Sequence, residues 1–490
     1  MPRQLENAGQ KTGRASIAKS KRLGKWVAGG ASVLAAAAMA NEAPAQSTYS
    51  PLLERLIQKG FLTEQEARTV SAQVQTNRAT PADSKWKLSD SIKSISLFGD
   101  ARFRYEYRGA TNPKQADLTT GNIYYRERFR YAFRAGIRGD LYDNFNFGIR
   151  IETSSNPRSQ FVTLADDSNP TPSAKNSDTV AIGQVYVGWK PADWYEMTVG
   201  RMPMPLYTTP MVWSPSISPE GAFEKFNYSS HGVEVFADFG QFMYQDTNPD
   251  VAIPSSDTAL LAWQIGVNAH FNKSMSVKIA PTLYTYAGEG SGNGLPGPFI
   301  GQGSPSGQNQ AGGSFIYNQT GINDLRVFEL PTEYNFKIAG LNAKAFGDFA
   351  VNLEGNQRAK AATLVGFKKQ TDEDKAYQAG LSIGTNPGLV YGATSKRGTW
   401  EARGYWQHVE QYALDVNLTD ADFFEGRGNL EGAYGAIAYS FTDAIIGTVR
   451  YGYAQRINKS LGTGGSNPDL APLNPVYNYH LVQLDFTWRF

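Results

Sequence analysis

The chain is 490 residues long, carries a formal net charge of +2 and contains no cysteine. The absence of thiols excludes a disulfide scaffold, thiol catalysis and cysteine-ligated metals, and the near-balanced charge argues against general electrostatic binding to nucleic acid. Aromatic residues make up 12% of the chain, with 49 glycines and 26 tyrosines, a profile that favours many strands with aromatic belts over a helical bundle.

The first 45 residues have the three parts of a secretion signal. A basic segment precedes Trp26, an apolar run follows from Val27 to Ala40, and Ala43-Pro44-Ala45 matches an A-x-A cleavage pattern. We therefore predict a cleaved signal peptide over residues 1–45, with an uncleaved anchor as the alternative. No later segment reaches the about 18 to 20 consecutive apolar residues that a spanning helix needs, so in a membrane the mature chain would have to be a closed barrel.

Residues 46–90 are expected to form a short periplasmic helical segment and a linker. Apolar residues between Leu52 and Ile57 have helical spacing, and Gly60 ends this first helix. The capping box Thr63-Glu64-Gln65-Glu66 begins a second helix. The segment is either a handle for contact with an oligomer or the cell wall, or a spacer packed against a barrel mouth.

From residue 91 to the end the apolar pattern has a period of two. Between residues 95 and 108, Leu97 and Phe103 fall on one face, whereas Asp100, Arg104 and Glu106 fall on the other. The pattern recurs over residues 126–138, 261–271, 445–453 and 480–490. Such alternation means one apolar and one wet environment. In a soluble sandwich the wet face would lie outside, whereas in a large barrel it would line water.

The connections between the strands alternate in length. Six short turns are expected near residues 141–144, 191–193, 240–241, 272–273, 338–340 and 442–443, and a somewhat longer one near 386–398. Eight long polar loops are expected near residues 109–122, 153–178, 202–229, 246–258, 288–324, 354–374, 415–428 and 457–477. This predicts an all-β fold over residues 91–490, a transmembrane antiparallel β-barrel of about 16 strands with short periplasmic turns and long extracellular loops. Counts of about 14 or 18 stay open.

Arginines of the first three strands fall on the predicted lumen face: Arg102, Arg104, Arg126, Arg128, Arg130, Arg134, Arg138 and Arg150. Guanidinium groups stay charged at any relevant pH, and a row of them on a pore wall favours anions over cations. We therefore expect the pore to prefer anions. The alternative is that the arginines pair with Asp100, Glu106 and Glu152, giving a rigid wall with little selectivity.

The third long loop is far more apolar than the other loops. Side chains such as Met204, Tyr207 and Trp213 would not be left in bulk water, so we expect the loop to fold into the barrel and narrow the channel. Glu220 and Glu224 would then face the arginine row and set a transverse field across a constriction. A loop packed over the rim or against a neighbouring protomer is the alternative.

Several short motifs carry a family resemblance. They are Gly99–Tyr105, Arg126–Tyr131, Gln184–Val187 with Trp189, Gly200–Met202, Pro219–Gly221 and the leader ending Leu62–Ala67. With these motifs the chain resembles the Gram-negative "putative porin" family and, more distantly, phosphate-selective porins. The resemblance implies an outer-membrane channel for small solutes. The ending with Phe486, Trp488 and Phe490 looks like the C-terminal signal that the barrel-assembly machinery reads.

Together these patterns predict a porin, a water-filled channel for passive diffusion of small hydrophilic solutes and ions. A structural or adhesive barrel without an open pore, and an anion (phosphate)-selective channel, are the alternatives. The four histidines are scattered and none lies in a nucleophile motif, so no enzyme activity, metal or cofactor is expected. The expected partners are outer-membrane lipid and lipopolysaccharide, the assembly machinery, the solutes and, by analogy with general porins, two further copies in a homotrimer.

Overall fold

The structure is a computed structural model of the whole chain. It describes Lys59 and residues 89–490, except 113–122, 155–158, 166–178, 247–256, 289–308, 312–313, 317–321, 323, 365–372, 464, 466–468 and 471–474. The predicted signal peptide and nearly all of the predicted helical segment over residues 46–90 therefore lie outside the described residues. Residues 89–490 form one compact unit.

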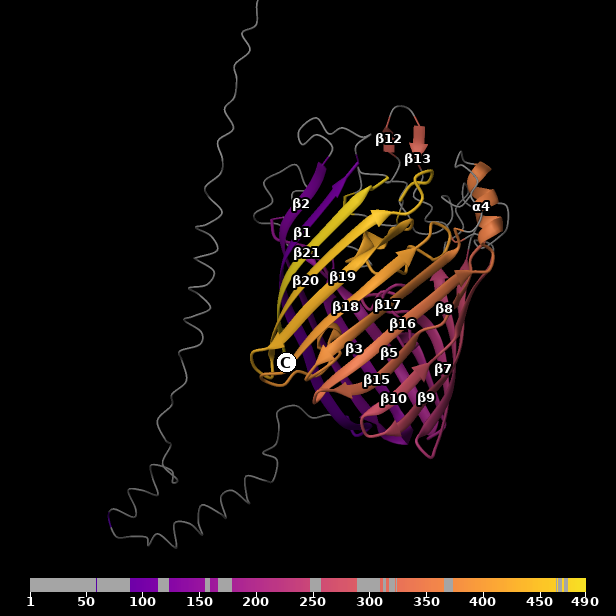
Figure 1. Cartoon of the computed structure of the whole chain (residues 1–490). Helices are drawn as coiled ribbons and strands as arrows, with labels where there is room; N and C mark the ends of the chain where they lie inside the picture. Colours follow the sequence, from indigo (N-terminus) through magenta and orange to yellow (C-terminus); the bar gives the residue numbers. More distant parts are fainter. Residues whose placement is uncertain are drawn as a thin grey trace, which may run out of the picture. The chain divides into compact units, whose positions relative to one another are not determined.

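Within the described residues, sixteen antiparallel strands close into a barrel (Figure 1). They are β1 (Ile92–Thr111), β2 (Ile123–Leu141), β3 (Phe145–Thr153), β5 (Val180–Ala192), β6 (Tyr195–Arg201), β7 (Glu220–Ser230), β8 (Val233–Gln245), β9 (Thr258–Asn272), β10 (Met275–Ile279) continued by β11 (Thr282–Gly288), β14 (Arg326–Glu329) continued by β15 (Thr332–Ile338), β16 (Leu341–Asn352), β17 (Lys375–Gly384), β18 (Trp400–Val409), β19 (Leu430–Ser440), β20 (Ile445–Arg456) and β21 (Asn478–Arg489). The barrel closes where β1 pairs with β21, from Asp100 opposite Arg489 to Thr111 opposite Asn478.

Two neighbouring strands are each split by a proline. Pro281 separates β10 from β11, and Pro331 separates β14 from β15, because proline has no N–H to give to the ladder. The smaller elements are β4 (Val162–Thr163), the hairpin β12 (Asn309–Ala311) and β13 (Ser314–Ile316), the helix α4 (Gly355–Leu364) and the 3-10 turns η1 (Tyr142–Asn144), η5 (Leu389–Tyr391) and η6 (Phe424–Gly426). None of the helices in the described residues is long and apolar enough to cross a membrane.

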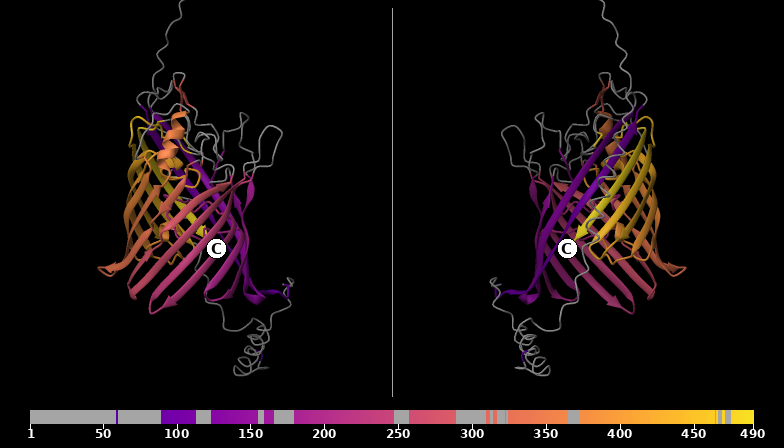
Figure 2. Two further views of the ribbon diagram at one scale, coloured as in Figure 1. Left: turned by 90° about the vertical axis from the view of Figure 1, so that its right-hand side faces the viewer. Right: turned by 90° about the vertical axis from the view of Figure 1, so that its left-hand side faces the viewer.

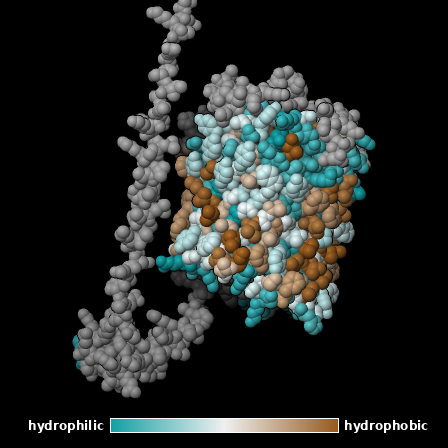
Figure 3. Space-filling model, in the orientation of Figure 1, coloured by the Kyte–Doolittle hydropathy of each residue, from teal (hydrophilic) through white to brown (hydrophobic). Residues whose placement is uncertain are grey.

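The two faces of the barrel wall differ as the period-two pattern predicts. On β1, Leu97 is 68% exposed and Phe103 57%, whereas Asp100, Arg104 and Glu106 are buried on the inner side. Apolar side chains lie on the outside of the wall in Figure 3. The sequence pattern therefore placed the apolar face outward and the polar face inward correctly.

Seven connections at one end of the barrel are short turns, apart from one of 15 residues (385–399), and eight longer loops lie at the other end (Figure 2). The predicted count of sixteen strands is confirmed. One predicted turn is wrong, because Gly240-Gln241 lies inside β8 and the chain turns at His231-Gly232. There φ is +50° and +80°, the left-handed pair that a two-residue hairpin requires.

Candidate functional site

The eight arginines of the predicted row all lie on the inner face of β1, β2 and β3. Across β1 and β2, Arg104 stands opposite Arg130 and Arg108 opposite Arg126. Like charges placed face to face in this way repel, unless carboxylates lie between them. The carboxylates that lie among these arginines therefore decide what the row can do.

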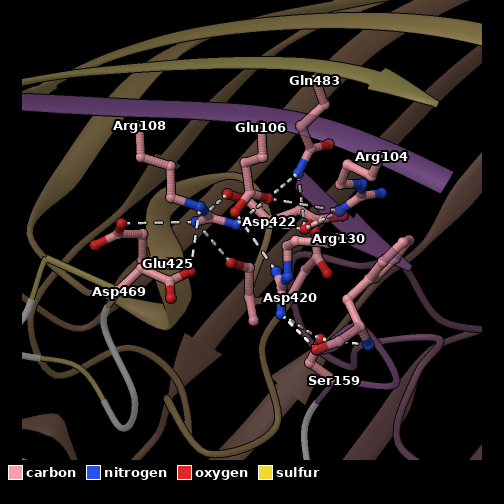
Figure 4. A network of polar contacts seen from close by, with 12 residues as sticks. Arg104, Glu106, Arg108, Arg130, Ser159, Asp420, Asp422, Glu425, Asp469 and Gln483 are labelled. Carbon is pink, nitrogen blue, oxygen red and sulfur yellow. Dashed lines mark hydrogen bonds and ion pairs between the residues drawn. The ribbon is translucent and has the colours of Figure 1, made fainter. Parts of the chain in front are cut away.

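In the half of the row nearer the long loops, Glu106 is the central carboxylate (Figure 4). Its side chain is fully buried, and it lies within ion-pair distance of Arg104, Arg108, Arg128 and Arg130. Two of the contacts to its oxygens are Arg128 Nε to Oε1 at 2.7 Å and Gln483 Nε2 to Oε2 at 2.8 Å. The pairing of these arginines with Glu106 is part of the alternative that the sequence left open, a rigid wall with little selectivity.

Two loops supply further carboxylates to the same arginines. In the loop 410–429, Asp422 pairs with Arg104 at 2.9 Å. In the loop 457–477, Asp469 pairs with Arg128 at 2.6 Å and with Arg108 at 3.2 Å. Each of these arginines is therefore matched by at least one carboxylate, and the two loops are bound to the wall.

The half of the row nearer the short turns is arranged differently. Asp100 stands directly between Arg134 of β2 and Arg489 of β21, and Arg102 Nε donates to it at 2.9 Å. Arg138 has no carboxylate within ion-pair distance among the described residues; its guanidinium lies 5.3 Å from the ring centre of Phe98. Positive charge is in excess at this level of the wall.

These arginines border a cavity of about 730 Å³. Its roof includes Pro210 and Asp420 of two loops, and its floor includes Tyr391 of the long turn 385–399. Asp443 and the C-terminal Phe490 also border it. We call this cavity the arginine chamber, and the side chains used below are Arg102, Arg134, Arg138, Arg489, Tyr391, Tyr405 and Tyr434.

The third long loop, residues 202–219, lies inside the barrel. Trp213 is 3% exposed, and its ring centre lies 6.3 Å from that of Tyr284 on β11 and 6.0 Å from that of Phe242 on β8. Met211 is equally buried in the same apolar cluster, and Met204 packs at its edge. The apolar side chains of the loop thus contact the inner wall.

The same loop is anchored by hydroxyl groups to acidic residues of the opposite wall. Tyr207 donates to Glu333 at 3.0 Å, Thr208 donates to Glu329 at 2.7 Å, and Thr209 donates to Asp348. These carboxylates belong to β14, β15 and β16, about half a turn of the barrel from β1 and β2 in strand order. The third loop is therefore attached to the acidic side of the lumen.

Glu220 and Glu224 correct the sequence prediction. Both belong to β7 and share a face with Phe226 and Tyr228, which are 42% and 71% exposed on the outside of the barrel. Glu220 pairs there with Arg201 at 3.0 Å. Neither glutamate faces the arginine row, because β7 begins at Glu220 and its alternation sends even-numbered side chains outward.

The loop 410–429 takes the place that the two glutamates were expected to fill. Its backbone meets the third loop, where Ser214 N donates to Leu418 O at 2.7 Å and Asp420 N donates to Pro210 O at 3.0 Å. The lumen is thus crossed from the acidic wall to the arginine row by two touching loops. This was missed from the sequence, although the buried pair Phe423-Phe424 was a signal of the same kind as Trp213.

The comparisons with known proteins identify the family. The family described as "Putative porin" matches residues 111–293 and 305–490 of the chain. The chain belongs to this family. Among solved structures, it is similar to an engineered protein titled "Asymmetric conductivity of engineered proteins" (TM-score 0.36) and to a double and a triple mutant of Rhodopseudomonas blastica porin (TM-score 0.37 each). All three are 12% identical, and each match covers 81% of this chain and 100% of that one.

No curated protein matches the chain. The family assignment rests on the sequence match and agrees with the resemblance found in the short motifs. The arginines and the inserted loops lie on the inner face of the barrel of this porin.

Three loop carboxylates of the porin have shifted pKa values. Burial opposes ionisation of Asp422, but Arg104 and Arg108 hold the pKa of this carboxyl below its usual value. Burial, with the neighbouring Asp422, raises the pKa of Asp420 to about 6. Burial also opposes ionisation of Asp469, but Arg108 and Arg128 hold the pKa of this carboxyl below its usual value. Asp420 is therefore the loop carboxylate whose charge changes near neutral pH.

The last strand of the porin ends with aromatic side chains on the outer face. Trp488 and Phe490 are 51% and 44% exposed, and their ring centres lie 5.5 Å apart. Phe486 precedes them on the same face. Their role as an assembly signal stays a prediction.

Proposed function

We propose that this porin forms a water-filled channel in the outer membrane for passive diffusion of small hydrophilic solutes and ions. The observation that carries the proposal is the closed sixteen-strand barrel with a charged inner face around a cavity of about 730 Å³. Barrels of about sixteen strands leave an aqueous channel, whereas about eight strands fill their own interior. The apolar outer face suits contact with lipid.

The loops 202–219 and 410–429 narrow this channel. Support comes from their burial inside the barrel and from the hydrogen bonds that join them at Ser214 and Asp420. The narrowing is thus built from two loops rather than from the third loop alone.

The channel favours anions through the half of the arginine row nearer the short turns. The arginines near the long loops are matched by Glu106, Asp422 and Asp469, so they add little net field. Arg138 and Arg489 face no carboxylate within ion-pair distance among the described side chains, and cationic groups on a pore wall favour anions.

The reversal potential in a salt gradient tests this preference. Arg138→Ser is expected to shift the reversal potential toward cations, since it removes an unmatched charge. The matched control is Arg201→Ser on the outer face, which removes the same charge outside the lumen. Equal reversal potentials for the Arg138 variant and the unmodified chain would contradict the anion preference.

The route to the membrane follows from the predicted targeting features. Residues 1–45 act as a cleaved signal peptide, and residues 46–90 form a periplasmic helical segment. Phe486, Trp488 and Phe490 are read by the barrel-assembly machinery. The folded chain then meets lipopolysaccharide and outer-membrane lipid, and it assembles as a homotrimer.

A barrel without an open pore is the second candidate, because the loop 410–429 is buried along almost its whole length. Swelling of liposomes in a small uncharged sugar separates the two candidates. Liposomes that contain the folded porin are expected to swell, and liposomes without protein are the control. An absence of swelling would favour the structural barrel.

A further inference from the structure

We propose that the arginine chamber is a binding site for aromatic carboxylates, small molecules that carry a carboxylate group on an aromatic ring. The inference rests on the proposed channel function and names the class of solute that the channel selects. Two features of the chamber carry it: a cluster of arginines on one side and a cluster of tyrosines on the other.

The cationic side is built around Asp100. Arg134 and Arg489 flank this carboxylate on the two neighbouring strands, and Arg102 approaches it two residues further along β1. The guanidinium groups of Arg102 and Arg134 therefore share one carboxylate, and that of Arg489 lies beyond ion-pair distance of it. Their remaining N–H groups can donate to a second carboxylate, in the bidentate geometry that guanidinium favours.

Two further observations keep part of this side available to a solute. Arg489 donates hydrogen bonds from Nη1 to the backbone oxygens of Gly392 and Ala393, at 3.3 and 2.7 Å. It has no carboxylate within ion-pair distance in the described part of the chain. Arg138 lies against Phe98 and is likewise unmatched there. Asp443, which also borders the chamber, accepts a hydrogen bond from the backbone N–H of Arg397 at 2.7 Å.

The aromatic side lies on β18, β19 and the long turn. Tyr405 and Tyr434 are stacked with ring centres 4.8 Å apart, and Tyr391 lies 4.6 Å from the guanidinium of Arg403. Rings in such a cluster attract a further ring by stacking or edge contacts. Inorganic phosphate or acetate could bind to the arginines, but neither carries a ring that would contact the tyrosines.

The long turn places one ring of the aromatic side next to the arginines. Gly392 and Ala393, the two residues after Tyr391, accept hydrogen bonds from Nη1 of Arg489 through their backbone oxygens. Tyr434 lies further away, because through Gly452 and Leu481 it is in register with Arg108, eight residues along β1 from Asp100. The cavity of about 730 Å³ also lies within the size range of small-molecule sites.

Block of the chloride current through single channels in a planar bilayer tests the site. We expect benzoate to half-block the current at a concentration about fivefold lower than acetate, because only benzoate gains the ring contacts. Arg138→Ser and Tyr391→Leu should each remove this difference. Arg138 has no carboxylate to leave unpaired among the described residues, so its variant should fold. Arg126→Ser, on the same strand but outside the chamber, should keep the difference.

Saturation-transfer NMR with benzoate, on the folded full chain in detergent micelles, gives a readout that needs no open channel. We expect transfer that is reduced in Arg138→Ser and kept in Arg126→Ser. Open channels with equal block by benzoate and acetate would overturn the chamber and leave the porin standing. Absent channels with an Arg138-dependent NMR signal would overturn the porin and keep the chamber. Equal NMR signals in all three proteins would overturn the chamber by themselves.

Discussion

Glu106 is the residue that stabilises the half of the arginine row nearer the long loops. Four arginines from two strands surround its fully buried side chain, and Gln483 of β21 donates to it. Burial of so many guanidinium groups is tolerable only when each has a carboxylate near it. Removal of the central negative charge leaves the arginines opposed to one another.

Glu106→Gln is therefore expected to lower the free energy of unfolding by about 3–5 kcal/mol, the range for breaking a buried ion pair. A urea titration of the chain folded in micelles measures this change. Glu220→Gln is the matched control, since Glu220 pairs with Arg201 on the outer face with 57% of its side chain exposed. The control should change stability by no more than about 1 kcal/mol. Equal effects of the two variants would contradict this view of Glu106.

Asp420 makes the selectivity depend on pH. Its pKa of about 6 means that the side chain is ionised at pH 7.5 and protonated at pH 5, so the roof of the chamber loses a negative charge on acidification. Asp422, Arg104 and Arg108 are the charged groups that act on it, and Ser214 Oγ lies 3.5 Å from it. We expect the reversal potential to move toward anions as the pH falls from 7.5 to 5.

Asp420→Asn provides the control for this shift, because it removes only this titratable side chain from the chamber. The variant should show most of the acid-state selectivity at both pH values. A pH shift of the same size in the variant would assign the effect to other groups.

At the residue scale, the sequence predicted the inner arginines well and the two glutamates poorly. The arginines lie in long strands where a strict period of two fixes the face. For Glu220 and Glu224, the prediction depended on where the loop ends and β7 begins. A shift of the strand start by a few residues decided whether these side chains were in the loop or on the outer wall.

At the scale of elements, the two inserted loops are attached to walls of opposite charge. The third loop is bound through hydroxyl groups to Glu329, Glu333 and Asp348. The loop 410–429 is bound through Asp422 to Arg104 of the arginine row. Each loop therefore covers the charge of the wall that holds it.

Deletion of either loop is expected to raise the single-channel conductance, but the two deletions should shift selectivity in opposite directions. Replacement of residues 413–426 by a short Gly-Ser linker uncovers arginines and should shift the reversal potential toward anions. The same replacement of residues 204–217 uncovers carboxylates and should shift it toward cations. Shifts of the same sign in both variants would contradict the assignment of the loops to opposite walls.

The sequence predicted these elements unequally. Alternating strands and most turns followed from local patterns, whereas the turn at His231-Gly232 was misplaced to Gly240-Gln241. Gly240 is a strand glycine, and a Cβ there would lie 2.5 Å from the ring of Phe242, so the glycine makes room for an aromatic side chain. The path of the loop 410–429 depends on contacts with residues some 300 positions away, such as Arg104 and Arg108, which no local pattern contains.

At the scale of the whole molecule, closure of the barrel places the first and the last strand side by side. Pairing of β1 with β21 sets Arg489 beside Asp100, so the first and last strands build one side of the chamber. The arginines lie on one wall and the acidic residues on the other, with two loops between them. We infer that a solute passes between walls of opposite charge and meets excess positive charge near the short-turn end.

The most direct test of the channel is single-channel recording of the purified, folded chain in a planar bilayer, with the reversal potential read in a salt gradient. We expect stable open steps and a reversal potential on the anion side. Open steps with cation selectivity would contradict the role of the arginine chamber. Protein shown to be folded that gives no steps would contradict the channel itself.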